Sequence, residues 1–234
     1  MKKLIFLLII FFSCQLAALK NFVLISAPGS GKGTFSQYLV EKYGYVHVCP
    51  GDMFRDEISR KTDFGKHIEP IVANGDYIDK TIVCKLMAAH LEKILEEGKK
   101  FILDGFPREE YSFNFLHNFF EKHSLTGDVC FLQFEADDDV CKERILGRVV
   151  CPQCFMVYNK ESARIKESVV CDNCGSSLIA RLADNQRIAE KRLRYFHSEI
   201  EPLLEMVKRF YEVIRIEAAC SRSELEEKYV QLID

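Results

Sequence analysis

The sequence predicts an α/β fold of three layers, in which helices cover both faces of a parallel sheet. Two observations predict it. Short apolar runs rich in β-forming residues alternate with longer segments of helical periodicity, and the first run leads into a glycine-rich loop followed by a helix. The 234 residues exceed one average domain of about 150 residues, so we expect one large domain with insertions or a second, small domain.

The predicted elements alternate along the chain. Strands are expected at residues 22–25, 45–48, 101–103, 129–134 and 213–217. Helices are expected at residues 34–43, 78–97, 111–123, 138–146, 184–211 (with a bend near Pro202) and 223–232. Residues 54–74 are charged and broken, which is consistent with short helices. In the helix at 78–97, the residues expected to face the core are Ile82, Leu86, Leu91, Ile94 and Leu95.

Composition and charge are those of a globular chain. Apolar residues make up 48% and charged residues 29%, which excludes disordered, collagen-like and polytopic membrane proteins. The net charge of −3 provides no basic field for nucleic acid, so an anionic ligand needs a local cluster of cations. The 10 cysteines are too few for a disulfide scaffold, and those outside two Cys-x2-Cys pairs are scattered, which favours a reducing compartment.

Residues 1–20 resemble a secretory signal, which points to the opposite compartment. A basic start precedes an unbroken apolar run, residues 4–12, and then a small, mixed segment. That run of nine residues is too short to span a bilayer, which needs about 20. Two interpretations stay open: an export or lipid-anchoring signal, with Cys14 as the lipid acceptor, or an N-terminal extension without function.

A glycine-rich loop joins the first predicted strand to the first predicted helix: Ser26-Ala27-Pro28-Gly29-Ser30-Gly31-Lys32-Gly33-Thr34. Glycines let backbone N–H groups turn toward phosphate oxygens, the helix N-terminus adds its dipole, and Lys32 places a point charge on the terminal phosphates. The generic motif has Gly first and Ser or Thr directly after the lysine, whereas this chain has Ser26 and Gly33. A strand–helix turn without a ligand seldom carries such a run, so the loop predicts a nucleotide site.

The loop and further segments in the same order resemble the adenylate kinases and related nucleoside monophosphate kinases. The insertion of Gly33 is that family's variant, and Ser26 stands where the family has Gly. The further segments are Gly51-Asp52-Met53-Phe54-Arg55, Asp104-Gly105-Phe106-Pro107-Arg108, Arg144-Ile145-Leu146-Gly147-Arg148, and Arg181, Asp184 and Arg192. The resemblance covers about residues 21–217 and implies a core of the P-loop NTPase type.

Phosphoryl transfer between two polyanions needs cations that converge on the transferred group, and this chain has several at motif positions. The resemblance implies a catalytic set of Lys32, Arg108, Arg148, Arg181, Arg192 and Asp104, in which Asp104 ends a strand and can hold Mg²⁺ through water. The implied ATP residues are Gly29, Ser30, Gly31, Lys32, Gly33, Thr34, Arg144, Arg148, Val157 and Tyr158. The implied AMP residues are Pro50, Arg55, Asp76, Tyr77, Ile78, Gly105, Phe106, Pro107, Arg108, Ser112, Arg181 and Arg192.

The acceptor pocket departs from the family pattern at two positions. Adenylate kinases usually have Thr where this chain has Pro50, and Gln, which hydrogen-bonds the AMP base, where it has Ser112. Pyrimidine-preferring relatives tend to have Ala and Asn at these two positions. This chain has neither the Thr and Gln of adenylate kinases nor the Ala and Asn of those relatives. Ser112 is too short for the same bidentate contact, which leaves backbone groups around residues 76–78 to define the base. AMP is the expected acceptor, and another nucleoside monophosphate is the alternative.

Four cysteines predict a structural zinc site. Cys151-x2-Cys154 and Cys171-x2-Cys174 are separated by 16 residues, and two such pairs make a closed tetrahedral site with no open position for catalysis. The alternatives are unligated thiols or, in an exported chain, two disulfides. The spacing also matches the long lid of zinc-containing bacterial adenylate kinases, which implies a ribbon that folds over ATP and excludes water.

These predictions combine into an expected organisation. We expect a core of residues 21–49, 80–147 and 182–234, a monophosphate-binding segment at 50–79, a zinc-binding lid at 148–181, and the extension at 1–20. The expected reaction is reversible, Mg²⁺-dependent transfer from ATP to AMP that yields two ADP. A catalytically silent nucleotide-binding zinc module is the alternative from another class, motivated by Ser26.

The reaction and the reduced thiols favour a cytoplasmic monomer without stable membrane association. Export or anchoring through residues 1–18 is the alternative. Nucleic-acid binding is not expected, since residues 149–179 contain only Lys160, Arg164 and Lys166 as cations.

Overall fold

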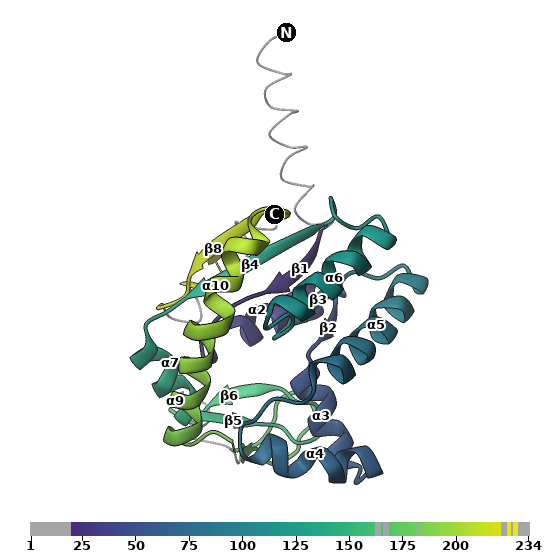
Figure 1. Cartoon of the computed structure of the whole chain (residues 1–234). Helices are drawn as coiled ribbons and strands as arrows, with labels where there is room; N and C mark the ends of the chain where they lie inside the picture. The colour runs from purple at the N-terminus through teal and green to yellow at the C-terminus, as the bar shows by residue number, and fades with distance from the viewer. Residues whose placement is uncertain are drawn as a thin grey trace.

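A computed structural model describes residues 20–161, 165, 169–181, 183–220, 224–225 and 227–228. Five parallel strands form its central sheet in the order β2-β3-β1-β4-β8 (Figure 1). Their bounds are Asn21–Leu24 for β1, Val46–Val48 for β2, Phe101–Asp104 for β3, Val129–Glu135 for β4 and Val213–Glu217 for β8. The predicted parallel sheet is therefore confirmed, with each predicted strand within a residue or so of its place.

Helices cover both faces of the sheet. One face packs against α5 (Lys80–Glu96), α6 (Glu110–Lys122) and α10 (Glu201–Val207), and the other packs against α2 (Lys32–Tyr43) (Figure 1). Within β1, Val23 packs into the buried cluster under α5, α6 and α10, and Phe22 packs into the cluster under α2. There Phe22 meets Phe35 of α2, with ring centroids 5.7 Å apart. Because both faces of the strands are buried, successive strand residues are apolar, as the unbroken runs in the sequence indicated.

The inward face of α5 differs from the prediction at two residues, Ile82 and Leu86, of which Leu86 is half-buried and lies outside the two buried clusters of the core. Ile82 is 42% exposed, and the buried residues are Cys84, Met87, Leu91 and Ile94. These four recur at intervals of three or four residues, so they form one stripe of the helix, while Ile82 lies two residues before that stripe and faces away from it.

The long C-terminal helical segment is interrupted close to the predicted bend. It comprises α9 (Gln186–Tyr195), a π-helical turn (Phe196–Ile200) and α10. The Asn185 side chain accepts a hydrogen bond from the Ile188 N–H at 3.1 Å, which explains why α9 begins after Asp184. The π-helical turn comes just before Pro202, whose missing N–H breaks the regular bonding pattern.

Two smaller segments lie at the same end of the molecule, beyond the carboxyl edge of the sheet (Figure 1). The first contains α3 (Pro50–Ser59) and α4 (Asp63–Ala73), which are the short helices expected there. The second follows α7 (Asp138–Leu146) and is an antiparallel ribbon of order β6-β5-β7, with β5 at Arg148–Val150, β6 at Val157–Asn159 and β7 at Ile179–Ala180. We call residues 148–181 the cysteine ribbon.

Two predicted segments fall largely outside the described residues. The signal-like extension is one, since the description begins at Lys20, and the helix at 223–232 is the other. Of the latter, Leu225 is described as helical, and it is buried against the core that α2 covers. Among the residues described, no helix has the length and apolar character needed to cross a membrane.

The connection between α4 and α5 docks on one face of α9. Gly75 approaches Ile188, the Asp76 carboxylate forms an ion pair with Lys191, and the Tyr77 ring lies 4.1 Å from the Tyr195 ring between centroids. Residues 188, 191 and 195 are three and four positions apart, so they form a single row along the helix. This docking sets where the α3–α4 segment stands relative to α9.

Gly75→Ala tests this close approach. Gly75 has φ +68°, and an added Cβ would lie 2.6 Å from Cγ2 of Ile188. We expect a loss of about 1–2 kcal/mol in the free energy of unfolding from the left-handed backbone, plus about 1–3 kcal/mol from overpacking, measured by urea denaturation. Gly98→Ala is the matched control, because Gly98 has φ +64° and nothing within 4 Å of an added Cβ, so only the backbone cost applies. Equal losses in the two variants would contradict the docking argument.

Candidate active site

The glycine-rich loop lies at the carboxyl end of β1 and turns into α2. Gly29 and Gly31 have φ angles of +84° and +101°, which favour glycine. A Cβ on Gly29 would lie only 2.4 Å from the Cys141 carbonyl oxygen of α7, so no other residue fits there. Lys32, Gly33 and Thr34 form the first turn of α2, where the Thr34 N–H donates to the Gly31 carbonyl at 3.0 Å and the N–H groups of Lys32 and Gly33 precede the first helical acceptor. The loop therefore has the backbone shape of a phosphate cradle.

Lys32 extends over this loop, where its Nζ donates a hydrogen bond to the Ala27 carbonyl at 3.1 Å. Burial lowers the pKa of Lys32, and the Arg108 and Arg148 charges lower it further, while Asp104 opposes them. The charge of Lys32 is thus incompletely balanced by the protein. A bound polyphosphate would supply the missing negative charge.

Ser26, which stands where the family has Gly, forms a specific contact. Its buried hydroxyl accepts a hydrogen bond from the Phe134 N–H at 2.7 Å. One residue earlier the Ile25 N–H donates to the Leu132 carbonyl at 2.9 Å. Ser26 thus extends the link between β1 and β4 by one side-chain bond, at the point where the loop leaves the sheet.

Arg144 lies beside the loop at the end of α7. Its guanidinium donates to the carbonyls of Ser30 at 3.5 Å and Cys220 at 3.0 Å. It therefore joins the loop to the segment after β8, so its position relative to the loop is set by two backbone groups from distant parts of the chain.

Asp184 organises two of the predicted arginines. Arg148 donates two hydrogen bonds to the Asp184 carboxylate, both at 2.6 Å, and Arg192 has a nitrogen 3.7 Å from the same carboxylate. The Asp184 side chain is only 2% exposed. A bidentate pair of this kind holds the Arg148 plane in one orientation. Burial lowers the pKa of Arg192, and the neighbouring Arg148 adds to that effect.

Asp52 organises two more of the predicted arginines. Its carboxylate forms an ion pair with Arg55, and a nitrogen of Arg181 lies 4.0 Å from it. Burial is the main cause that lowers the pKa of Arg181 to about 9, with the Arg55 and Arg148 charges adding to it. Arg181 stays charged at neutral pH. Since Arg181 belongs to the cysteine ribbon and Asp52 to α3, this contact joins the two segments over the site.

Arg108 is held from two sides. Its Nε donates to the Gly105 carbonyl at 2.7 Å, and its guanidinium lies over the Tyr77 ring, 4.9 Å from the centroid. Gly105 has φ +78°, and a Cβ there would approach an Arg108 nitrogen to 2.9 Å. Phe106 and Pro107 complete the turn and are buried. The Tyr77 ring thus contacts both Arg108 and the Tyr195 ring, whose centroid lies 4.1 Å from its own.

Asp104 ends β3 at the centre of these cations. Burial opposes its ionisation, but Lys32 and His47 outweigh burial and hold the pKa of Asp104 at about 2. The carboxylate is therefore ionised at neutral pH. It fits a Mg²⁺ ion that arrives with a nucleotide, because Mg²⁺ prefers carboxylate oxygen and retains most of its own water.

Several buried polar atoms in this region have no partner within the protein. Among the described residues, such atoms occur on Ser30, His47, Arg55 and Arg181 of the site, and on His123 and Gln133 elsewhere. Unpaired buried donors are costly, so a site that carries them on cationic side chains is suited to an anionic ligand.

The two acceptor-pocket departures have structural explanations. The Ser112 hydroxyl accepts from the Arg108 and Glu109 N–H groups at 3.1 and 3.2 Å and donates to the Glu109 carbonyl at 2.9 Å. It is fully used in the cap of α6. Pro50 is buried in the first turn of α3, where a missing N–H costs nothing. Asp76 and Tyr77 are exposed and Ile78 is half-buried in the connection to α5.

The four predicted zinc ligands come together in the cysteine ribbon. The Sγ atoms of Cys151 and Cys174 are 3.3 Å apart, those of Cys154 and Cys171 are 3.5 Å apart, and those of Cys154 and Cys174 are 3.6 Å apart. A tetrahedral zinc with Zn–S bonds of about 2.3 Å needs sulfurs about 3.8 Å apart, so the set fits the ion.

The two ribbon residues assigned to ATP lie on β6. Val157 is 39% exposed. The Tyr158 hydroxyl lies 3.3 Å from the Cys171 sulfur and accepts from the Asp172 N–H at 3.3 Å, so Tyr158 supports the cysteine cluster. Its contact with a nucleotide stays a prediction.

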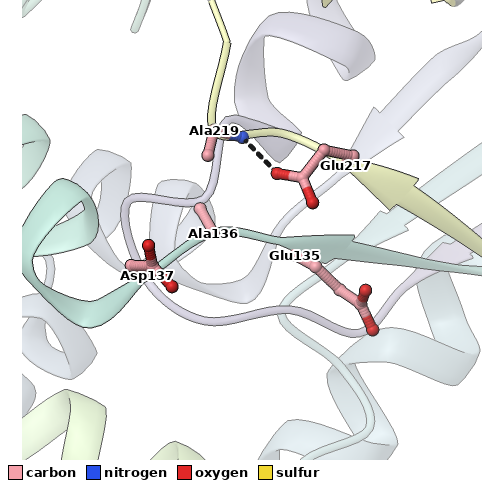
Figure 2. Close-up of a pocket in the computed structure, with 5 residues that line it drawn as sticks. All are labelled: Glu135, Ala136, Asp137, Glu217 and Ala219. Atoms are coloured by element: carbon pink, nitrogen blue, oxygen red, sulfur yellow. Dashed lines mark hydrogen bonds between the residues drawn. The ribbon is translucent and has the colours of Figure 1, made fainter.

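A cavity of about 300 Å³ lies beyond the carboxyl ends of β4 and β8 (Figure 2). Its lining includes the carboxylates of Glu135, Asp137 and Glu217, and Glu217 accepts a hydrogen bond from the Ala219 N–H at 2.9 Å. These carboxylates repel polyphosphate. The cationic cluster around Lys32 is therefore better suited to phosphate than this cavity is.

Sequence reasoning gave no role to His47, to Asp52 or to Asp184. The two aspartates stand inside quoted motifs beside arginines, so a search for carboxylates that balance buried cations would have found them. His47 carries no comparable signal. Burial opposes its charged form, but Asp104 and Asp52 outweigh burial and raise the pKa of His47.

Asp184→Asn tests the charge balance. The substitution keeps the shape but leaves Arg148 and Arg192 without their carboxylate, so we expect a loss of about 3–5 kcal/mol in the free energy of unfolding. Inorganic tripolyphosphate should stabilise this variant more than wild type, because it supplies the missing negative charge. Asp139→Asn is the control: the Asp139 side chain is 95% exposed in an ion pair with Lys142, and we expect less than about 1 kcal/mol. Similar losses in both variants would refute the role of Asp184.

Comparisons with known proteins agree with this geometry. The family model described as adenylate kinase matches residues 24–212. An adenylate kinase of Thermococcus kodakarensis is 35% identical over 214 residues, which are 92% of this chain and 94% of that protein. An adenylate kinase of Borreliella burgdorferi is 29% identical over 211 residues, 90% of this chain and 97% of that protein. One from Fervidobacterium nodosum is 34% identical over 189 residues, 80% of this chain and 85% of that protein. The phosphate cradle, the converging arginines and these similarities together establish that the chain is a nucleoside monophosphate kinase of the adenylate kinase family.

Proposed function

We propose that this enzyme catalyses reversible transfer of the terminal phosphoryl group of ATP to AMP, yielding two ADP. The observation that carries the proposal is the set of buried, unpaired donors on Ser30, Arg55 and Arg181, which lie in three separate motifs. Two polyanions that meet end to end would pair donors spread in this way.

The residues divide into two binding groups. The loop from Gly29 to Thr34, which includes Lys32, holds the phosphates of ATP, and Arg144 lies beside the base of ATP. Arg55 and Arg108 bind the phosphate of AMP. Arg148, Arg181 and Arg192 surround the transferred group and balance the charge that spreads over its oxygens during transfer. Their pairs with Asp52 and Asp184 orient them before substrate arrives.

The chemistry requires positioning rather than a general base. The attacking oxygen of AMP belongs to a phosphate that is already an anion, so no side chain has to remove a proton from it. The protein holds the two phosphates in line and keeps water away. When bound with ATP, Mg²⁺ supplies charge neutralisation for the phosphates, and Asp104 is the residue that would hold it through water.

We propose that residues 50–79 and 148–181 act as two flaps over the core formed by 21–49, 80–147 and 182–234. The contact between Asp52 and Arg181 and the docking of Asp76 on Lys191 support this division, because they join the flaps to each other and to α9. A ribbon that closes over ATP would direct the phosphoryl group to AMP and away from water.

AMP is the proposed acceptor although Ser112 is occupied by the cap of α6. Backbone groups of Asp76, Tyr77 and Ile78 then have to define the base, since Pro50 and Ser112 offer it no free hydrogen-bond partner. The names of the relatives support AMP, and another nucleoside monophosphate is the alternative that this pocket suggests.

We propose that the four cysteines bind structural zinc and that the enzyme works as a cytoplasmic monomer on small-molecule nucleotides. The sulfur geometry supports zinc, and reduced thiols and a supply of ATP support the cytoplasm. Sequencing the mature N-terminus tests the location: a start after Ala18, or a lipid on Cys14, would show export or anchoring.

The acceptor is tested by a transfer assay with MgATP and AMP, CMP, UMP or GMP. We expect strong preference for AMP, read by separation of the nucleotide products. Lys32→Ala is the control for mechanism: transfer should fall at least about 100- to 1,000-fold with the fold retained by circular dichroism. Preference for another base would reassign the acceptor and leave the mechanism intact. ATP binding without transfer to any acceptor would favour a silent nucleotide-binding module.

Zinc removal is expected to loosen the ribbon more than the core. Cys171→Ser should speed hydrogen exchange of amides in residues 148–181 while those of β1 and β4 stay protected, because only the ribbon is built around the sulfurs. Hydrolysis of ATP relative to transfer should rise as water enters. Cys84→Ser, a buried cysteine of α5 outside the ribbon, is the matched control. Unchanged exchange in the ribbon would exclude a structural metal there.

A further inference from the structure

A second group of metal-ligating side chains lies where β2 passes into α3. A ring nitrogen of His47, the sulfur of Cys49 and a carboxylate oxygen of Asp52 all lie within 4.8 Å of one another. Among the residues that the structure describes, this is the one such group besides the cysteine ribbon. This group lies within the candidate active site, next to Asp104 and Arg55.

The two ring nitrogens of His47 face different carboxylates. Nδ1 is 3.9 Å from an oxygen of Asp52, and Nε2 is 3.5 Å from an oxygen of Asp104. A histidine that binds a metal through one nitrogen almost always directs its other N–H to a carboxylate or a carbonyl. Asp104 already stands in that supporting position, so Nδ1 is the nitrogen directed toward a metal shared with Asp52.

The chemistry of the donors selects the class of metal. Imidazole nitrogen, thiolate sulfur and carboxylate oxygen together suit borderline-soft divalent cations such as Zn²⁺, Cd²⁺ or Co²⁺, whereas Mg²⁺ prefers oxygen alone. Bonds of about 2.0–2.3 Å require donors roughly 3.3–3.8 Å apart, so the donor atoms have to approach one another by at most about 1.5 Å. The Cys49 side chain makes no capping bond at the start of α3, which leaves its sulfur available for this shift.

Charge balance decides what binding does. The metal replaces the proton of the Cys49 thiol, which leaves to solvent, so the three ligands contribute two negative charges to a dication. Asp52 is at the same time the partner of Arg55 and lies 4.0 Å from Arg181. Nδ1 of His47 faces one oxygen of Asp52, and both arginines face the other. A metal on the first oxygen draws negative charge away from the shared carboxylate, and so weakens its hold on both arginines.

We propose that His47, Cys49 and Asp52 form a second metal site, specific for borderline-soft divalent cations, whose occupation inhibits phosphoryl transfer. The binding part stands on the donor geometry alone, and the inhibitory part rests on the proposed function of Arg55 and Arg181.

The binding part is tested by Co²⁺ titration of the full chain, with bound metal counted by equilibrium dialysis and thiolate-to-cobalt charge transfer followed by absorbance. We expect wild type to bind one equivalent of Co²⁺ more than Cys49→Ser does. The variant should also lack the share of the charge-transfer absorbance that this equivalent produces. Taking the difference between the two proteins removes the contribution of the ribbon cysteines. Cys84→Ser, which alters a buried thiol outside both groups, should match wild type. Equal stoichiometry in wild type and Cys49→Ser would overturn the site.

His47→Gln provides an independent variant if Cys49→Ser does not fold. It keeps the side-chain length and polarity but removes the imidazole ligand, so it too should lose one equivalent with an unchanged circular dichroism spectrum. Retention of that equivalent in folded His47→Gln would refute the assigned donor set.

The inhibitory part is tested by transfer from MgATP to AMP with increasing Cd²⁺. We expect wild type and Cys84→Ser to lose activity reversibly, with recovery on addition of a chelator and excess Mg²⁺, and Cys49→Ser to be resistant. A second bound equivalent that leaves the transfer rate unchanged would overturn the inhibition. Absence of transfer in wild type assayed with MgATP and no added Cd²⁺ would instead contradict the proposed function, and the binding result would stand.

Discussion

The cations around the phosphate loop are buried beside one another, and their repulsion is balanced within the protein by three carboxylates. Asp184 pairs with Arg148, Asp52 pairs with Arg55, and Asp104 stands next to His47. Burial lowers the pKa of Lys32 and of Arg181, and neighbouring arginines lower both further, so cation–cation repulsion persists beside the carboxylates. The rest of the site depends on this excess of positive charge, because a polyanionic substrate supplies the negative charge that the protein lacks there.

The parallel sheet explains why these charges can be brought together. The carboxyl ends of neighbouring strands meet at one edge, so the loop after β1, Asp104 at the end of β3 and His47 in β2 become neighbours although they are far apart along the chain. Arg108 comes from the turn after β3, Arg55 from α3, Arg148 and Arg181 from the cysteine ribbon, and Arg192 from α9. Docking of Gly75, Asp76 and Tyr77 along one row of α9 connects the position of the first flap to the helix that carries Arg192.

The departures from the family pattern are explained by local bonding. Ser26 links the loop to β4 through its hydroxyl, and Ser112 closes the cap of α6 through three hydrogen bonds. The Ser112 hydroxyl donates once and accepts twice in this cap, so it has no free position to offer a substrate. Cys49 differs, because it makes no capping bond and lies within reach of two other metal-ligating side chains.

Local sequence patterns predicted the strands of the central sheet, most helices, the phosphate loop and the cysteine cluster, because apolar periodicity, glycine conformation and Cys-x2-Cys geometry act over a few residues. The short strands of the cysteine ribbon were not predicted. The outward position of Ile82 shows the limit of periodicity where the stripe of a helix is set by what it packs against. The folded arrangement sets which carboxylate pairs with which arginine, as Asp184 and Arg148 are 36 residues apart. It also decided that His47 meets Asp104. Such contacts depend on how distant segments are brought together, and the order of residues along the chain does not contain that information in local form.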